Sequence, residues 1–243
     1  MTAANLGGPA RAGGSSPRAQ VSRAALARNA RLALGSAAPG ARIVGDVRAD
    51  AWGHGALLAA QELLGAGADV LRVDAAAEAV LRAAGIHAVS SSAEPTIDTR
   101  TVLGLPGGDD AARPVLTLRG SILSIKPLRA GEGVSYGYRH RAPVDTNVAL
   151  VTGGYAQGIV RSLGDRVEVA SRVGRHGIVG RVAMDVCVVD VGPAPLQRGD
   201  DVLFFGDPER GAPSLAGWES AAGLAAAEIV AVIGVRAVRE VIE

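Results

Sequence analysis

The sequence predicts an α/β + β protein, in which a parallel sheet with helical crossovers is followed by a small, mostly-β domain. Between residues 21 and 90, helix-like and strand-like segments alternate, as they do in βα units. After Pro114 the apolar residues instead alternate with polar ones, and Gly, Asp and Pro turns separate the runs. The 243 residues, of which 48% are hydrophobic, are enough for one large or two modest domains.

The α/β part follows a segment that has no periodicity. Residues 1–20 are mostly Gly, Ala, Ser and Pro, so we expect a disordered tail without the apolar core of a secretory signal. We expect the α/β part to span residues 21–112. Its expected elements are a helix from Val21, a strand at 41–47, a helix at 56–67, a strand at 68–74, a helix at 75–86 and a short strand at 87–90.

The mostly-β part is expected to span residues 113–243. Its alternating runs are typical of a small barrel or sandwich. We expect strands within 115–128, 146–152, 165–172, 177–191 and 200–206, then one or two helices within 214–234 and a short strand at 236–242.

Charge and composition exclude several classes of function. The net charge of +1 gives no strong attraction to nucleic acid or to a membrane surface, and no apolar run is long enough to span a bilayer. The single cysteine, Cys187, excludes an internal disulfide and a cysteine metal cluster, and it suits a reducing cytoplasm. Aromatic residues make up only 3%, and alanine buries little area, so we expect thin cores and a dependence on oligomerisation.

One segment has the form of a strand end, a tight turn and a helix start. It reads DVRADAWGHG (46–55), and Arg48 falls at the carboxyl end of the expected strand, where α/β enzymes place reactive groups. Four further motifs lie in the β part: LRAGEG (128–133), VSYG (134–137), GYAQG (154–158) and GIVGRVAMD (177–185). Together these segments resemble the motifs of the alanine racemase family, which are pyridoxal-phosphate enzymes, over most of 21–90 and nearly all of 113–206.

The resemblance implies a full (β/α)8 barrel followed by a C-terminal β domain. Such a barrel needs about 250 residues, whereas fewer than a hundred lie between Val21 and Pro114. Residues 99–105 (TRTVLGL) resemble the last barrel strand of the family, although they come directly after the second βα unit. We therefore expect a truncated (β/α) barrel fragment, from which most of the cofactor cradle has been lost.

The resemblance also assigns catalytic positions. Arg48 occupies the place of the lysine that forms a Schiff base with pyridoxal phosphate, and a guanidinium, with a pKa above about 12, is not competent to do so. The only lysine, Lys126, lies in an alternating strand, where a solvated face is expected. Tyr136 matches the family's second base, which faces the active site of the partner subunit in a dimer. Substrate-side positions are matched by Tyr155, Met184 and Asp185.

The positions that contact the cofactor in the family match this sequence less well. Trp52 stands where the family has a tyrosine that contacts the cofactor phosphate, and its indole N–H still donates. Ala227 stands where the family has a second such tyrosine, whose hydroxyl is lost. Arg100 is a weak match to the arginine that touches the ring nitrogen. His54 lies at a helix start, as a cap or a supporting donor, and no metal site is expected.

Two functions remain open at this stage. The first is a non-catalytic or catalytically impaired relative of the racemases, which binds or dimerises as a homodimer or as a heterodimer with a complete racemase. The alternative is an active pyridoxal-phosphate-dependent racemase that interconverts L- and D-alanine for cell-wall precursor supply. A third hypothesis is that the chain is the product of a decaying gene and has no selected role. The missing lysine favours the first.

Overall fold

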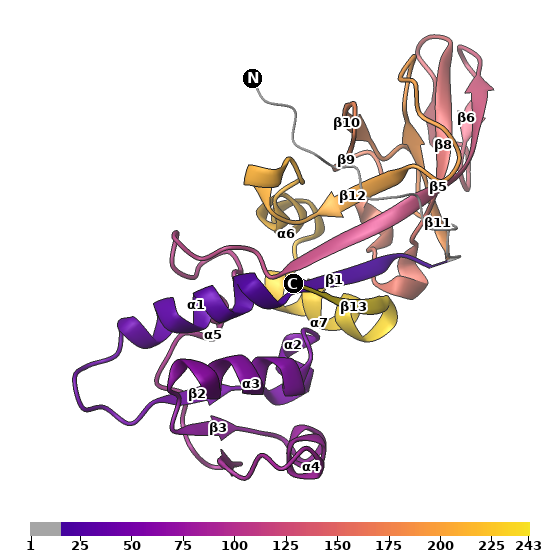
Figure 1. Ribbon diagram of the computed structural model, residues 1–243. Coiled ribbons are helices and arrows are strands. Elements are labelled where there is room, and N and C mark those ends of the chain that lie inside the picture. The colour runs from indigo at the N-terminus through magenta and orange to yellow at the C-terminus, as the bar shows by residue number, and fades with distance from the viewer. Residues whose placement is uncertain (1–15) are drawn as a thin grey trace. The chain divides into compact units, whose positions relative to one another are not determined.

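The computed structural model describes residues 16–243, which divide into two compact units (Figure 1). Among the described residues, the α/β unit consists of residues 20–116, 225–235 and 239–243, and the β unit of residues 16–19, 117–224 and 236–238. Three strands, β1 (Arg18–Ser22), β5 (Leu116–Leu128) and β13 (Val238–Ile242), have residues in both units. The chain is thus an α/β barrel fragment combined with a mostly-β domain, as the sequence predicts.

The α/β unit is built on a three-stranded parallel sheet in the order β2-β3-β4 (Figure 1). Val44 pairs with Val70, and Leu71 pairs with Val89. Helix α1 packs on α3 and α5, and α3 packs on α4. The elements are α1 (Arg23–Gly35), β2 (Val44–Asp46), α2 (Arg48–Trp52), α3 (Ala56–Ala66), β3 (Val70–Arg72), α4 (Ala75–Ala83), β4 (Val89–Ser90), α5 (Thr99–Leu103) and α7 (Ala226–Arg236).

Side-chain caps set where the helices of this unit begin. The Ser22 hydroxyl accepts the amide of Ala25 at the start of α1, and the Asp74 carboxylate accepts the amide of Ala77 at the start of α4. The buried faces of α1 and α3 are largely alanine and leucine, so the unit has the thin core that the composition predicts.

The β unit contains a largely antiparallel sheet. The strand order is β10-β9-β12-β5-β1-β13, and β8 pairs with both β5 and β11. A separate hairpin joins β6 to β7. The remaining elements are β6 (Gly133–Val134), β7 (His140–Arg141), β8 (Thr146–Thr152), η1 (Tyr155–Gln157), η2 (Arg161–Leu163), β9 (Glu168–Ser171), β10 (Gly174–Gly177), β11 (Val186–Asp190), β12 (Asp201–Phe205), η3 (Pro208–Arg210) and α6 (Leu215–Ala222).

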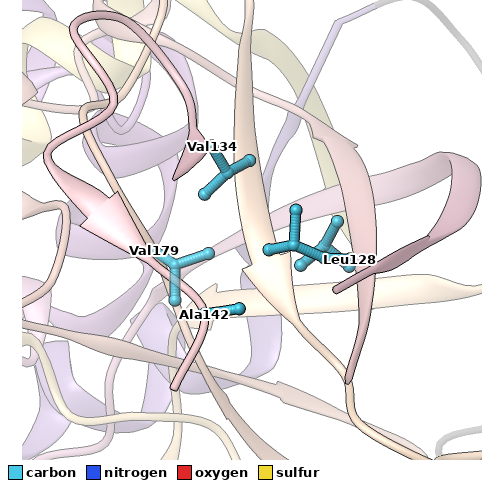
Figure 2. Close-up of a cluster of buried hydrophobic side chains, with 5 residues drawn as sticks. Leu128, Val134, Ala142 and Val179 are labelled. Atoms are coloured by element: carbon cyan, nitrogen blue, oxygen red, sulfur yellow. The ribbon is translucent and has the colours of Figure 1, made fainter. Parts of the chain in front are cut away.

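A small hydrophobic cluster fixes the β6–β7 hairpin to the sheet (Figure 2). Val134 and Ala142 come from the hairpin, Leu128 and Val148 from β5 and β8, and Val179 from the segment after β10. A second centre surrounds Trp218, whose indole meets the Phe204 and Phe205 rings edge-on.

Several expectations about local structure were wrong. The helix expected from Val21 begins at Arg23, and within the expected strand at 177–191 only Gly177 and Val186–Asp190 are strand residues. In the segment 99–105, Thr99–Leu103 form helix α5 rather than a strand, because the Asp98 carboxylate accepts the amide of Thr101 and Gly104 ends the helix with φ +63°. The expected disordered tail of residues 1–20 is wrong for Arg18, Ala19 and Gln20, which belong to β1. Ala19 and Val21 are fully buried on alternate positions of that strand. Residues 1–15 lie outside the described part of the chain.

Among residues 16–243, no single helix is long and apolar enough to cross a membrane, and only α6 and α7 taken together reach that length and composition. The described residues contain no group of three or more His, Cys, Asp or Glu side chains that could hold a metal ion.

Candidate active-site residues

Arg48 is held by a buried carboxylate. Asp46 ends β2 with a side chain only 3% exposed, and the Arg48 guanidinium binds it with two nitrogens, Nη2 at 2.6 Å from Oδ2 and Nε at 3.0 Å from Oδ1. The backbone amide of Arg48 also donates to Asp46 Oδ1, at 3.0 Å. The hydrogen bond to Asp46 raises the pKa of Arg48 above its usual range, so the guanidinium stays charged.

A left-handed turn follows Arg48 directly. Four successive residues of α2, Ala49, Asp50, Ala51 and Trp52, have φ between +49° and +55°. Each costs on the order of 1–2 kcal/mol for a residue with a β-carbon. A conformation of this kind persists only where surrounding contacts determine it.

Buried and half-buried polar groups hold this turn in place. Asp74 Oδ2 accepts the amide of Ala49 at 2.6 Å, and Asp50 Oδ1 accepts the amide of Ala56 at 2.7 Å. Arg239 donates to the other oxygen of Asp50. The backbone hydrogen bonds to Ala77 and Ala49 lower the pKa of Asp74, which therefore stays ionised over the physiological range.

His54 lies beneath the turn and is fully buried. Its Nδ1 is 3.0 Å from the carbonyl oxygen of Ala51 and 3.2 Å from that of Trp52, so Nδ1 carries the proton and donates. Nε2 is buried without a hydrogen-bond partner among residues 16–243. Burial lowers the pKa of His54 to about 4, and the ring is therefore neutral at neutral pH.

Of the other predicted residues of the α/β unit, Trp52 belongs to the turn, whereas Arg100 and Ala227 lie on other helices. Trp52 is half-buried and ends the left-handed turn. Arg100 is exposed on α5, where its Nε is 3.4 Å from Asp98. Ala227, in α7, presents a methyl group only.

Four predicted residues lie together on the β unit, and a fifth that the sequence analysis missed joins them. The guanidinium carbon of Arg161 is 5.7 Å from the ring centroid of Tyr136 and 5.7 Å from that of Tyr155, within cation–π range. The segment around Met184 and Asp185 runs beside Tyr155. We call the set Tyr136, Tyr155, Arg161 and Met184 the tyrosine patch; its two tyrosines and Met184 are 63%, 44% and 53% exposed.

Backbone hydrogen bonds fix the GYAQG segment against the segment containing Met184. The amide of Tyr155 donates to the Ala183 carbonyl at 2.9 Å, and the amide of Gly153 donates to the Asp185 carbonyl at 2.9 Å. The Gln157 side chain links the two, donating to Asp185 Oδ1 at 3.0 Å and accepting the amide of Gly154. Gln157 thus forms an amide-to-carboxylate hydrogen bond between the two segments.

Gly154 is required where these segments meet. A β-carbon at this position would lie 2.2 Å from the Met184 carbonyl oxygen, which is backbone and cannot move aside easily. We expect Gly154→Ala to destabilise the β unit by about 1–3 kcal/mol, the usual cost of overpacking. Gly217→Ala is the matched control, because Gly217 is exposed in helix α6 with open space around it. That change should be neutral or stabilising by up to about 1 kcal/mol.

Urea unfolding of both variants measures the difference. Equal stability of Gly154→Ala and the parent protein would contradict the close approach of the two segments.

The residues present do not fit covalently bound pyridoxal phosphate. The aldehyde needs a neutral amine, and position 48 carries a charged, carboxylate-bound guanidinium. The only lysine, Lys126, is exposed on β5.

Both parts of the chain are similar to known proteins. The family model described as "Alanine racemase, N-terminal domain" matches residues 21–112, and "Alanine racemase, C-terminal domain" matches residues 115–241. The alanine racemase of Mycobacterium ulcerans is 45% identical over 125 residues, which are 51% of this chain and 32% of that protein. That of Thermobifida fusca is 38% identical over 146 residues, 60% of this chain and 39% of that protein.

The fold agrees with solved structures. The alanine racemase from D-cycloserine-producing Streptomyces lavendulae superposes with a TM-score of 0.84 at 22% identity, over 94% of this chain and 97% of that chain. The Bacillus anthracis alanine racemase with bound L-Ala-P gives 0.81 at 18% identity, over 94% and 95%. The sequence matches span only about a third of the length of the curated relatives. Since the two family models together match nearly all of residues 21–241, the chain belongs to the alanine racemase family.

Proposed function

We propose that this protein is a non-catalytic member of the alanine racemase family, whose β unit serves in dimerisation. The single observation that carries the proposal is the Asp46–Arg48 pair at the place of the family's Schiff-base lysine. Arginine alone would remove the reactive amine. A buried carboxylate that binds it with two oxygens supports a stable structural role for position 48 instead.

The tyrosine patch supports the dimerisation part of the proposal. Tyrosine, methionine and arginine are enriched at protein interfaces, and tyrosine and arginine dominate binding hot spots. Tyr136, Tyr155 and Met184 are largely exposed, while backbone hydrogen bonds order the segments that carry two of them. An ordered, exposed surface of this composition suits a partner of the same family: a second copy of this chain or a complete racemase.

The proposal is tested by purifying the tagged chain alone and after co-expression with a complete racemase from the same cell. We expect a dimer in at least one preparation, with no racemisation by the chain alone. Tyr136→Ala with Tyr155→Ala should weaken association at least about tenfold, since truncation of interface tyrosines typically costs more than 1 kcal/mol. Val173→Ala, at an exposed site outside the patch, should leave it unchanged.

Size-exclusion chromatography with light scattering separates the two partners. Homodimerisation appears with the chain alone, and a heterodimer appears only after co-expression. Monomers in both preparations, together with alanine racemisation by the purified chain, would overturn the proposal in favour of an active shortened racemase.

A further inference from the structure

We propose that the β unit carries a binding site for a small phosphate-bearing anion, in a pocket separate from the tyrosine patch. The pocket has a volume of about 620 Å³ and lies between the β6–β7 hairpin and the segment that joins η2 to β9. Its charged and polar lining consists of Arg139, His140, Arg141, Asp165, Arg166 and Glu168. The volume lies within the range of about 300–1,000 Å³ that is typical of small-molecule sites.

The arginines keep their positive charge while two of them are held in place. Arg141 Nη1 donates to the carbonyl of Gly131 at 2.8 Å, and Arg166 Nη1 donates to the carbonyl of Ala221 at 3.1 Å. Both acceptors are neutral, so each guanidinium is oriented without being neutralised. Arg139 is exposed and forms no ion pair among the described residues. Oriented guanidinium groups match phosphate oxygens in geometry and charge.

The carboxylates do not cancel this charge. The lining has three guanidinium groups against two carboxylates. Asp165 is held within the lining: its Oδ1 lies 3.0 Å from Nδ1 of His140 and accepts the amide of Gly180 at 2.8 Å. This leaves His140 Nε2 as the ring nitrogen without a partner among the described residues. Asp165 and Glu168 both keep their charge, so the three guanidinium groups leave the lining with one positive charge in excess.

The walls of the pocket are built on an ordered base. Ala142 and Val179 belong to the hydrophobic cluster of Figure 2, and each directly follows a lining residue, Arg141 and Ile178. The amide of Ile178 donates to the carbonyl of Val167 at 3.0 Å, across the pocket lining. A pre-organised site loses less conformational entropy when its ligand binds, so Arg141 and Arg166, which are held in place, are available for binding without prior rearrangement.

The test uses the full chain with pyrophosphate and inorganic phosphate as probes, at constant ionic strength because surface electrostatics are screened by salt. Chemical-shift changes of backbone amides in 139–141 and 165–168 report binding. We expect pyrophosphate to bind with a Kd below about 1 mM, equivalent to about 4 kcal/mol. Succinate at the same concentration should bind at least tenfold more weakly if the site prefers phosphate over carboxylate.

Variants of opposite charge make the test specific. Arg139→Gln with Arg166→Gln should weaken pyrophosphate binding at least tenfold, and Glu168→Gln should tighten it about threefold. Arg129→Gln is the matched control, since Arg129 is exposed, pairs with Asp145 and lies outside the lining. If the double variant unfolds, Arg139→Gln alone is used, because Arg139 is exposed and forms no ion pair among the described residues. We expect this single variant to bind pyrophosphate about threefold more weakly.

Three results would overturn the proposal. Absence of shifts up to about 10 mM pyrophosphate, where a site of the expected affinity is more than nine-tenths occupied, overturns the proposal. Equal affinity in the Arg139→Gln and Arg129→Gln variants also overturns it, and so does weaker binding by Glu168→Gln. None of these readouts depends on dimerisation or on racemisation.

Discussion

Arg48→Lys alone should fail to restore efficient covalent capture of pyridoxal phosphate, whereas Arg48→Lys combined with Asp46→Asn should restore it. An aldehyde condenses with a neutral amine, and the buried Asp46 carboxylate favours the charged form of any cation at position 48. A neighbouring carboxylate raises an amine pKa by roughly one to two units, so the neutral fraction falls on the order of 10- to 100-fold. Asparagine has the shape of aspartate without its charge.

The experiment is done in a Lys126→Arg background, which removes the only native lysine. Borohydride reduction followed by peptide mass spectrometry locates the trapped adduct. We expect none within the parent chain, little in the single variant, and at least tenfold more at position 48 in the double variant. Arg31→Lys, at an exposed position of α1, reports the reactivity of an ordinary surface lysine.

Two results would contradict this account. Equal trapping in the single and double variants would mean that Asp46 does not control the cation. The native chain could also trap more adduct than the Lys126→Arg protein does. Lys126 would then hold the cofactor, and the proposed loss of catalysis would be wrong.

The free energy of unfolding should decrease steeply on acidification from pH 6.5 to about pH 4, because of His54. The folded-state pKa of His54 is lowered from 6.5 to about 4 by burial. Between pH 6.5 and pH 4 the unfolded state binds the proton on His54 and the folded state does not. The contribution of neutral His54 to stability is therefore fully present above pH 6.5 and is lost as the pH falls. The slope is about 1.4 kcal/mol per pH unit, which gives a loss of about 3 kcal/mol across the window.

Urea unfolding at several pH values, followed by the ellipticity of the helices, measures this slope. His54→Asn keeps an N–H donor for the carbonyls of Ala51 and Trp52 but does not titrate, so its stability should vary much less between pH 6.5 and 4. His87→Asn, at an exposed position after α4, should retain the parent slope. Burial also lowers the pKa of His176, which is less buried and should leave a smaller residual slope. An unchanged slope in His54→Asn would show that another group is responsible.

The sequence predicts those parts of the fold that depend on local chemistry. The alternation of β2, α3 and β3 and the strand runs of the β unit follow from hydrophobic periodicity and from the glycine and proline turns between the runs. The error at residues 99–105 has a clear origin. The strand was expected from the resemblance of this segment to the last barrel strand of the family, whereas the Thr101 amide donates a capping hydrogen bond to Asp98 and the segment forms a short helix.

The sequence predicts the candidate site less completely. Motifs identify Tyr136 and Tyr155, but nothing in the spacing indicates that Arg161 lies against both rings, because that contact depends on how the η1 and η2 turns fold. The position of Asp46 in the sequence also indicates a partner for Arg48. It is a charged residue at the end of an apolar strand, two positions before Arg48, and side chains at that spacing in a strand share a face.

The left-handed turn after Arg48 has one further implication. Strained backbone near a cleft is often taken as a sign of ongoing chemistry, yet here the strain persists beside a side chain that cannot form the covalent bond. Its supports, His54 and the carboxylates of Asp50 and Asp74, are structural groups that direct the chain from strand β2 into helix α3. In this chain the strained backbone therefore serves the path of the polypeptide, and its presence is not in itself a sign of covalent chemistry at position 48.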